Sequence, residues 1–445
     1  MNALQLKGPQ ITFEPNPKIE LLKKIMLITY VVLETLYKTI FGKYLAVEME
    51  RLQCVAGAVL ACLLLIEWFR LDKDNKIKWI KRHSIVFIYF AIRVVTFISI
   101  GMQYTMLRSV FFEGIYLLVL TELIVDNEFC RKMVFRGFIL MNLALNIINT
   151  CIYAYCNLTD IVNNVEMTFL HRMVSIYTYV GDYSGVSYCS MYSNPNQIGL
   201  MTGIALLISI NYLSKDMSIL SKGLVGIYYI FSFYCIYYSN CRSAQLMLLV
   251  VIFMLITCNK TKVFKNKKKI IVLCMIVCII FTACIYIIAM THYEYGWPTL
   301  FEVQLGNVST QRYFIWKDCY YSHQDELLLG CGNMTLEKRD RYQYNLDKGI
   351  DKGLDINSSL IDYVGPHNGY IGTISCAGLT GFVAFIMLLL KKISDSKSLN
   401  EGYWYLAIVF ILGINLFECM MPISKNFVTL YMFLIMSMSD REVKK

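Results

Sequence analysis

The chain has 445 residues, of which 57% are hydrophobic and 17% are charged. Soluble domains carry roughly one quarter charged residues, so this composition excludes an ordinary soluble protein and predicts an integral membrane protein. The net charge of +10 does not indicate nucleic-acid binding, because most Lys and Arg residues stand in short connectors between apolar segments, where they orient helices in a membrane.

Apolar segments long enough to cross a bilayer recur along the chain. A helix needs about 20 mostly apolar residues to cross roughly 30 Å of hydrocarbon, and by this criterion we expect an all-α membrane protein of about twelve spans. The predicted spans are residues 25–46, 52–69, 83–101, 106–125, 134–155, 197–213, 221–239, 244–258, 270–290, 368–390, 403–419 and 425–438.

The basic residues fall in alternate connectors, for example from Arg70 to Arg82 and from Lys260 to Lys269. Short loops rich in Lys and Arg stay in the cytoplasm, so we expect these connectors and both termini to be cytoplasmic. An even number of spans satisfies this arrangement.

Two long connectors then fall outside the membrane, residues 156–196 and 291–367. The second is too long for a plain turn, and we expect it to fold as a small extracytoplasmic cap with short helices. The predicted organisation is therefore nine spans in residues 1–290, a catalytic loop in 291–367 and three spans in 368–445.

Polar residues gather at the outer ends of several spans. The segment "SNPNQIGL" begins at Ser193, and Asn194 before Pro195 indicates a turn that opens a helix with Asn196. One interpretation is a binding segment, and the other is simply a helix cap.

A second motif, "SNCRSAQ" from Ser239 to Gln245, places Arg242 in a very short outer connector. A guanidinium group there can clamp a pyrophosphate through paired hydrogen bonds. The alternative is an interfacial arginine that contacts membrane lipid headgroups.

The large outer loop contains three further features. Arg312 and Trp316 are four residues apart and would share one helix face, and Gly330 and Gly332 form a Gly-x-Gly turn. His367, followed by Asn368, stands at the outer end of the tenth predicted span, where histidine suits a general base near neutral pH.

Together these segments resemble the bacterial O-antigen ligase and polysaccharide polymerase family, over roughly residues 190 to 385. The order and location of the Asn-Pro-Asn, Cys-Arg-Ser, Arg-x-x-x-Trp, Gly-x-Gly and His-Asn segments carry the resemblance. Two positions depart from the family pattern: Leu327 to Leu329 precede Gly330 where a proline is frequent, and Cys241 stands where a serine commonly precedes the arginine.

The resemblance implies a GT-C-like membrane glycosyltransferase that moves a glycan from a polyprenyl pyrophosphate donor to an acceptor hydroxyl, located in the bacterial cytoplasmic membrane. We expect His367 to be the base of an inverting displacement, and Arg242 and Arg312 to hold the leaving pyrophosphate. The expected substrate-binding residues are Asn194, Asn196, Trp316, Gly330, Gly332 and Asn368. Alternative bases in the loop are Asp318, Asp325, Glu326 and Asp362.

No metal or cofactor is expected, because the sequence lacks a Gly-Lys-Ser/Thr phosphate loop, a His-Glu-x-x-His helix and any other recognisable ligand spacing. The spacing of Cys319 and Cys331 leaves open whether they form a disulfide.

The expected function is polysaccharide polymerisation with a polyprenyl-pyrophosphate-linked oligosaccharide as substrate, and a chain-length regulator as a possible partner. The alternatives are an O-antigen-type ligase, a polysaccharide flippase or other transporter with functional residues on interrupted helices, and a sensory protein without catalysis.

Overall fold

The computed structural model describes most of the chain and shows a mainly helical protein. The described residues are 17–99, 104–126, 128–159, 165–169, 172–176, 179–182, 185–188, 190–192, 194–213, 218–260, 266–291, 300–309, 312–323, 325–332, 367–400, 402–418 and 426–437. Residues 333–366, which include Asp362, lie outside them.

The N-terminal part of the chain folds into helices joined by short connections. These elements are α1 (Pro17–Leu36), α2 (Ile40–Arg70), α3 (Lys73–Arg82), α4 (Ser84–Ser99), α5 (Tyr104–Gly114), the π-helix η1 (Ile115–Leu120), α6 (Thr121–Asp126) and α7 (Glu128–Thr159). Since α5, η1 and α6 follow one another directly, they correspond together to one predicted span, 106–125.

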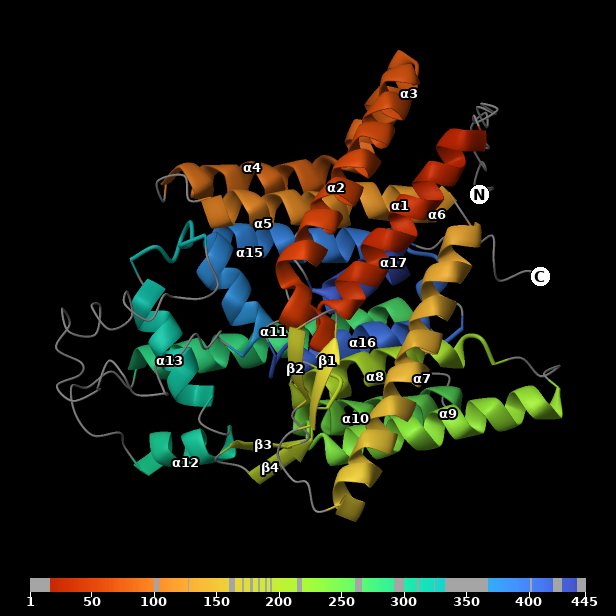
Figure 1. Ribbon diagram of the computed structural model, residues 1–445. Coiled ribbons are helices and arrows are strands. Elements are labelled where there is room, and N and C mark those ends of the chain that lie inside the picture. The colour runs from red at the N-terminus through yellow and green to blue at the C-terminus, as the bar shows by residue number, and fades with distance from the viewer. Residues whose placement is uncertain are drawn as a thin grey trace.

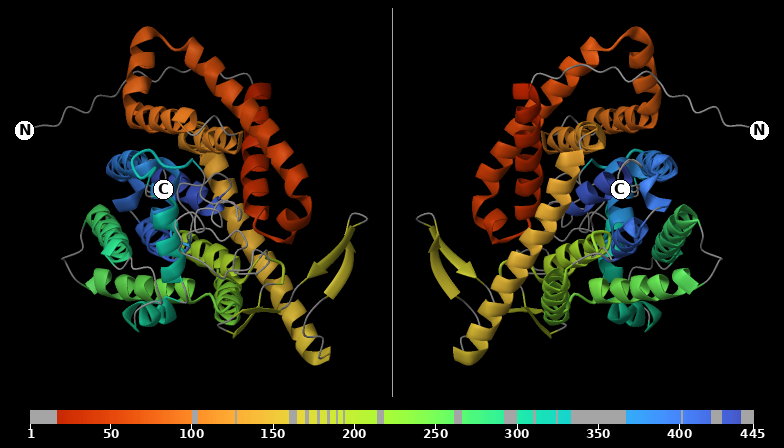
Figure 2. Two further views of the ribbon diagram at one scale, coloured as in Figure 1. Left: turned by 90° about the vertical axis from the view of Figure 1, so that its left-hand side faces the viewer. Right: turned by 90° about the vertical axis from the view of Figure 1, so that its right-hand side faces the viewer.

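Four short strands follow α7, rich in the Val, Thr, Ile and Tyr residues that favour strands. They form two antiparallel hairpins, β1 (Val165–Phe169) with β2 (Arg172–Ile176) and β3 (Tyr179–Asp182) with β4 (Gly185–Tyr188). Figure 2 shows a yellow hairpin projecting beyond the helices. The helical expectation is confirmed for the body of the protein, and the connector at 156–196 adds two small sheets that the sequence did not predict.

The rest of the chain is again helical. Its elements are α8 (Pro195–Ile210), α9 (Ile219–Tyr238), α10 (Arg242–Lys260), α11 (Lys267–Thr291), α12 (Leu300–Val308), α13 (Arg312–His323), α15 (Gly369–Asp395), the 3-10 helix η4 (Ser398–Asn400), α16 (Trp404–Ile414) and α17 (Phe427–Ser437). The predicted outer cap does contain short helices, α12 and α13.

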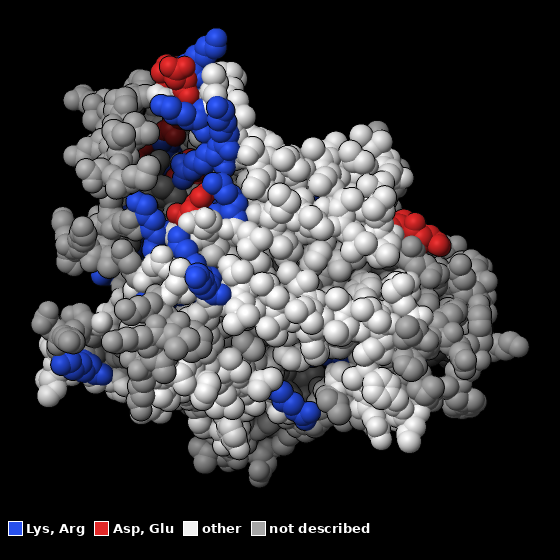
Figure 3. All heavy atoms as spheres, turned by 180° about the vertical axis from the view of Figure 1, so that it is seen from behind, with Lys and Arg blue, Asp and Glu red and all other residues white. Residues whose placement is uncertain are grey.

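Length and composition make this a helical membrane protein. Among the described residues, four helices are long and apolar enough to cross a bilayer: Tyr44–Arg70, Arg131–Tyr155, Lys267–Ile288 and Gly369–Asp395. The bent pair α3 and α4 counts as a fifth, and α8, α10, α16 and α17 include shorter apolar helices. Figure 3 shows a broad uncharged face bordered by Lys and Arg, as expected for a surface in contact with lipid.

The predicted span at 25–46 is wrong as a single helix. α1 ends at Leu36, and Thr39 begins α2 as its N-cap, with the amide of Phe41 donating to the threonine hydroxyl at 3.3 Å. Each of the other predicted spans overlaps one or more helices. How many of these helices cross the membrane stays a prediction.

Three helices form the interior and lead to the predicted site. α8, α16 and α17 are buried around almost their whole circumference, as apolar helices at the centre of a membrane bundle are. Asn194 begins α8, and Glu418 follows the end of α16. In Figure 1, α12 and α13 lie at the left end of these helices, and the start of α1 lies toward the right.

Candidate active site

A buried carboxylate joins three of the predicted site residues. Glu418 is only 5% exposed, and its Oε1 accepts hydrogen bonds from Nδ2 of Asn196 at 2.8 Å and from Nη2 of Arg312 at 3.1 Å. Its Oε2 lies 3.7 Å from Nδ1 of His367. The fold thus brings α8, α13 and the turn before α15 together around one acid.

Arg312 is held by the packing of its own helix. It is the first residue of α13, and its side chain is 21% exposed, so it faces both Glu418 and the surroundings. One turn later Trp316 is buried with Tyr313 and Ile371, and its indole N–H has no hydrogen-bond partner among the described residues. The indole anchors α13 against α15, and direct substrate contact by Trp316 stays a prediction.

His367 precedes α15 with a φ of 44°, a backbone conformation that costs a non-glycine residue about 1–2 kcal/mol. The adjacent cap holds it there. Oδ1 of Asn368 accepts from the amides of Tyr370 and Ile371 at 2.9 and 3.0 Å, and its Nδ2 donates to the carbonyl of Leu416 at 3.2 Å. Asn368 therefore ties the His367 turn to the segment that carries the buried acid.

The two asparagines at the start of α8 have different roles in the structure. Asn194 is the helix cap that one interpretation predicts, with its Oδ1 accepting from the amide of Gln197 at 3.1 Å. Pro195 follows at the first helical position, where no amide donor is needed. Asn196 instead donates to Glu418, so it alone of the pair belongs to the cluster.

The start of α10 lies directly beside the start of α8. A β-carbon on Gly199 would lie 2.7 Å from the β-carbons of Cys241 and Ala244, so only glycine permits this approach. The thiol of Cys241 lies 3.7 Å from the carbonyl oxygen of Asn196 and donates to it. Arg242 follows Cys241 in the chain and is exposed.

Cys241 is not an activated nucleophile. Burial raises the pKa of its thiol to about 11, and the nearby carboxylate of Glu418 contributes to the increase. A thiol with such a pKa is protonated near neutral pH, and the thiolate is the nucleophilic form. Its burial against Asn196 gives Cys241 the role of a small packing residue.

The Gly-x-Gly turn fills a break in α15. Gly330 and Gly332 have φ of 78° and 75°, and α15 is interrupted at Gly378, where φ is 65°. The amide of Gly332 donates to the carbonyl of Cys376 at 2.9 Å. A β-carbon on Gly378 would lie 2.2 Å from the carbonyl oxygen of Leu328. These glycines have a structural requirement, and their contact with substrate stays a prediction.

Arg93 supports the same break from α4. Its Nη1 donates to the carbonyl of Cys376 at 3.0 Å, and its Nη2 pairs with Glu113 of α5 at 3.1 Å. Glu113 also accepts from the hydroxyl of Tyr89 at 2.9 Å. Because this buried arginine has a carboxylate partner, its charge is compensated within the bundle.

The alternative bases are not part of the Glu418 cluster as described. Asp325 and Glu326 are exposed and line a shallow hollow beside the Gly-x-Gly turn. Asp362 and the side chain of Asp318 lie outside the described part of the chain. His367 therefore stays the first choice for a general base.

The described residues contain neither the disulfide between Cys319 and Cys331 nor a cluster that could bind a metal ion. Across the described ranges, no group of three or more His, Cys, Asp or Glu side chains is placed to hold a metal ion. The positive charge at the cluster comes from arginine.

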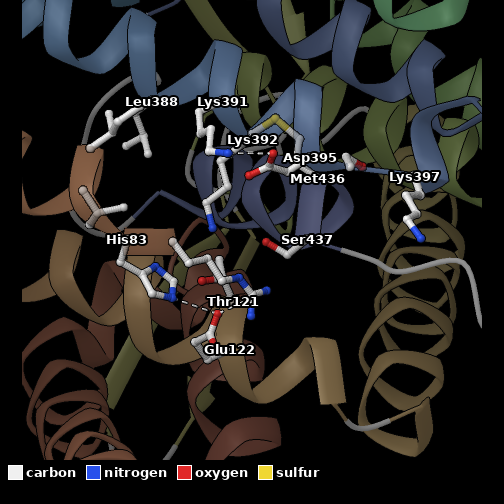
Figure 4. Close-up of a pocket in the computed structure, with 14 residues that line it drawn as sticks. His83, Thr121, Glu122, Leu388, Lys391, Lys392, Asp395, Lys397, Met436 and Ser437 are labelled. Carbon is white, nitrogen blue, oxygen red and sulfur yellow. Dashed lines mark hydrogen bonds and ion pairs between the residues drawn. The ribbon is translucent and has the colours of Figure 1, made fainter. Parts of the chain in front are cut away.

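A separate cavity of about 130 Å³ lies at the far end of α15. Figure 4 shows its lining, where Lys391 and Lys392 stand near His83 and Glu122. Nε2 of His83 lies 3.1 Å from Oε1 of Glu122. Arg82 also lines this cavity, and none of the predicted site residues does. Its basic lining agrees with the Lys- and Arg-rich connectors that are predicted to be cytoplasmic.

Sequence reasoning missed Glu418. It falls at the end of the predicted span 403–419, where it was counted as part of an apolar segment. A carboxylate at the outer end of a span is a signal in itself, because ionisable groups in such segments usually have a partner. The sequence does not identify the partner of this carboxylate, and only the fold shows that three residues distant in sequence lie around it.

The comparison with known families agrees with this geometry. Residues 227–386 match the family model described as O-antigen ligase. This segment is therefore similar to the O-antigen ligase family. The matched range contains Arg242, Arg312 and His367, whereas Asn196 and Glu418 lie outside it. The match points to ligation or polymerisation of glycans carried on lipid. No curated protein matches the chain.

Proposed function

We propose that this O-antigen ligase family protein is a polysaccharide polymerase. It transfers a glycan from a polyprenyl pyrophosphate donor to a lipid-linked repeat unit at the outer face of the membrane. The observation that carries the proposal is the Glu418 cluster, in which one buried acid holds Arg312 and His367 beside each other. Glycan transfer is assisted by positive charge at the leaving group and by a base at the acceptor hydroxyl, and a guanidinium and an imidazole can supply these two functions.

The donor would bind with its lipid tail between helices and its pyrophosphate near Arg242 and Arg312. Guanidinium groups suit this role because they stay charged and present paired donors to phosphate oxygens. Arg242 is exposed and Arg312 is partly exposed, so both are accessible. The two arginines would stabilise the negative charge of the departing pyrophosphate, and we propose that this makes a metal ion unnecessary.

His367 would act on the acceptor. As the acceptor oxygen forms a bond with the anomeric carbon, its proton passes to Nε2 of His367, and the bond between the anomeric carbon and the pyrophosphate oxygen breaks. One displacement of this kind inverts the anomeric centre. With a side chain 35% exposed and Nδ1 toward Glu418, His367 can present Nε2 to an acceptor.

Polymerase and ligase differ in acceptor, which is another lipid-linked repeat unit for the first and a lipid core, wall or protein for the second. We choose the polymerase because polymerisation is the more widespread use of the family. A chain-length regulator is a possible partner of such an enzyme.

One observation favours a transporter, since broken helices often form transporter binding sites. Here the break at Gly378 is occupied by the loop that contains Gly330 and Gly332, and the adjacent Arg93 is paired with Glu113. The carbonyls of Ser375 and Cys376 at the break already accept hydrogen bonds from the amides of Cys331 and Gly332. The proposal therefore stays with transfer chemistry at the outer end.

The test is the glycan ladder of a host that lacks this gene and expresses each variant at matched membrane levels. We expect His367→Ala and Arg312→Ala to reduce the ladder to single repeat units, since loss of a general base or of a charge-stabilising donor costs about 100-fold or more in rate. Arg242→Ala is expected to shorten it. Arg108→Ala is the control, because Arg108 pairs with Glu50 outside the cluster.

Full ladders for His367→Ala and Arg312→Ala would contradict the proposal. Repeat units trapped on the cytoplasmic face would indicate a flippase. Polymer that forms normally but stays on its lipid carrier in a strain without this gene would indicate a ligase.

A further inference from the structure

The two oxygens of Glu418 are used unequally. Oε1 accepts from both Asn196 and Arg312, at 2.8 and 3.1 Å, whereas Oε2 is 3.7 Å from Nδ1 of His367, beyond hydrogen-bond distance. In this arrangement the arginine has the strong contact with the acid, and the imidazole does not. The structure therefore shows the site with the base incompletely oriented.

We propose that the donor pyrophosphate and Glu418 compete for Arg312, and that the released carboxylate then pairs with His367. This inference rests on the proposed function and adds an order of events to it. Glu418 is a positioning residue that directs Nε2 of His367 to the acceptor only after donor has bound.

Burial explains why the carboxylate would change partner. Glu418 has a side chain only 6% exposed, so it cannot exchange Arg312 for water. An uncompensated buried carboxylate is costly. When a pyrophosphate takes the guanidinium, the nearest group able to compensate the acid is His367, most strongly after the imidazole has accepted the acceptor's proton.

The surrounding contacts allow this exchange with little movement. Asn196 holds Oε1 from α8, so the carboxylate can rotate about that contact. The backbone on either side of the gap is fixed, because the amide of Gly369 donates to the carbonyl of Asn415 at 2.7 Å and Asn368 donates to Leu416. Closing 3.7 Å to hydrogen-bond distance needs a side-chain shift of less than about 1 Å.

The experiment compares donor affinity with turnover in purified full-length protein. The probe for binding is undecaprenyl pyrophosphate, and turnover is measured by repeat-unit addition. In Glu418→Gln the charged competitor for Arg312 is gone, so we expect the probe to bind more tightly than to the wild type. Without a carboxylate to orient His367, we expect kcat to fall about tenfold or more.

Glu418→Asp is the second variant. It keeps the charge but is one methylene shorter, so it retains a contact with Arg312 and loses reach toward His367. We expect donor affinity near that of the wild type and a reduced kcat. Glu113→Gln is the matched control, because it removes the carboxylate of another buried arginine pair, Arg93 with Glu113, and should not tighten binding of the probe.

The outcomes separate this inference from the proposed function. A wild-type protein that neither binds the probe nor extends glycans would overturn the proposed function. If the wild type works but the Glu418 variants lose both affinity for the probe and turnover, only the exchange would be overturned. Unchanged turnover in Glu418→Gln would also overturn it.

Discussion

At the residue scale, burial distinguishes the acid from the arginine and the imidazole around it. The side chains of Arg312 and His367 are 21% and 35% exposed, whereas that of Glu418 is 6% exposed. A ligand therefore meets the arginine and the imidazole first, with the carboxylate behind them. This order suits an acid that positions its neighbours and does not contact the substrate itself.

The backbone of His367 allows function and stability to be separated. Because its φ is 44°, glycine is better accommodated there than alanine, and we expect His367→Gly to be more stable than His367→Ala by about 1 kcal/mol. Both variants lack the imidazole and should be inactive. Thermal unfolding of the two purified proteins measures the difference, and a more stable alanine variant would contradict the argument.

Cys241 gives a prediction about pH. Because burial raises the pKa of its thiol to about 11, the thiolate fraction is small at pH 7 to 8 and grows only as the pH approaches that value. We expect Cys241→Ser to retain the glycan ladder. Mass spectrometry after treatment with a maleimide at pH 8 should find Cys241 unmodified, whereas rapid labelling would show that the thiol is accessible and ionised.

How far the site was predictable depends on how local each contact is. Arg312 and His367 were predicted from short motifs, and a helix cap was one of two interpretations of Asn194, because those patterns lie within a few residues. Asn368 was expected to bind substrate, yet its amide is fully buried in a helix cap. Glu418 was missed because its partners lie far away in sequence, where no local pattern records the contact.

At the element scale, the interrupted helix α15 depends on the loop that fills its break. Gly378→Ala would place a β-carbon 2.2 Å from the carbonyl oxygen of Leu328 at a φ of 65°. We expect a loss of about 2 kcal/mol or more in stability and a loss of the glycan ladder.

Gly223→Ala in α9 is the matched control. A β-carbon on Gly223 would meet nothing within 4 Å, and alanine favours a helix over glycine by up to about 1 kcal/mol. Thermal unfolding should therefore show a lower midpoint for Gly378→Ala and an equal or higher one for Gly223→Ala. Equal stability of the two variants would mean that the break does not require glycine.

The helices themselves were largely predictable, because a long apolar segment is the strongest pattern that a membrane protein offers. The exceptions have physical causes. Thr39 caps a new helix within an apolar segment, and Gly378 breaks α15 because backbone groups freed there find partners in a distant loop. Neither event changes the average hydropathy of its segment, so hydropathy cannot report it.

At the scale of the whole molecule, charge is distributed unevenly between the two ends of the helices. The Glu418 cluster lies at the start of α15, and the basic cavity with Lys391 and Lys392 lies at its far end. Figure 3 shows Lys and Arg gathered on one side of a broad uncharged face. From the positive-inside rule we predict that the basic end faces the cytoplasm and that the cluster lies at the outer face.

Reporter fusions test this orientation directly. Alkaline phosphatase folds to an active enzyme only outside the cytoplasm, so we expect high activity when it is inserted within residues 333–366 and low activity when it follows Lys445. Green fluorescent protein at the same two positions should give the opposite result. Active phosphatase at the C-terminus, with a fluorescent insertion in the loop, would place Arg312 and His367 on the cytoplasmic side. Transfer from a donor presented at the outer face would then be impossible, whatever the geometry of the cluster.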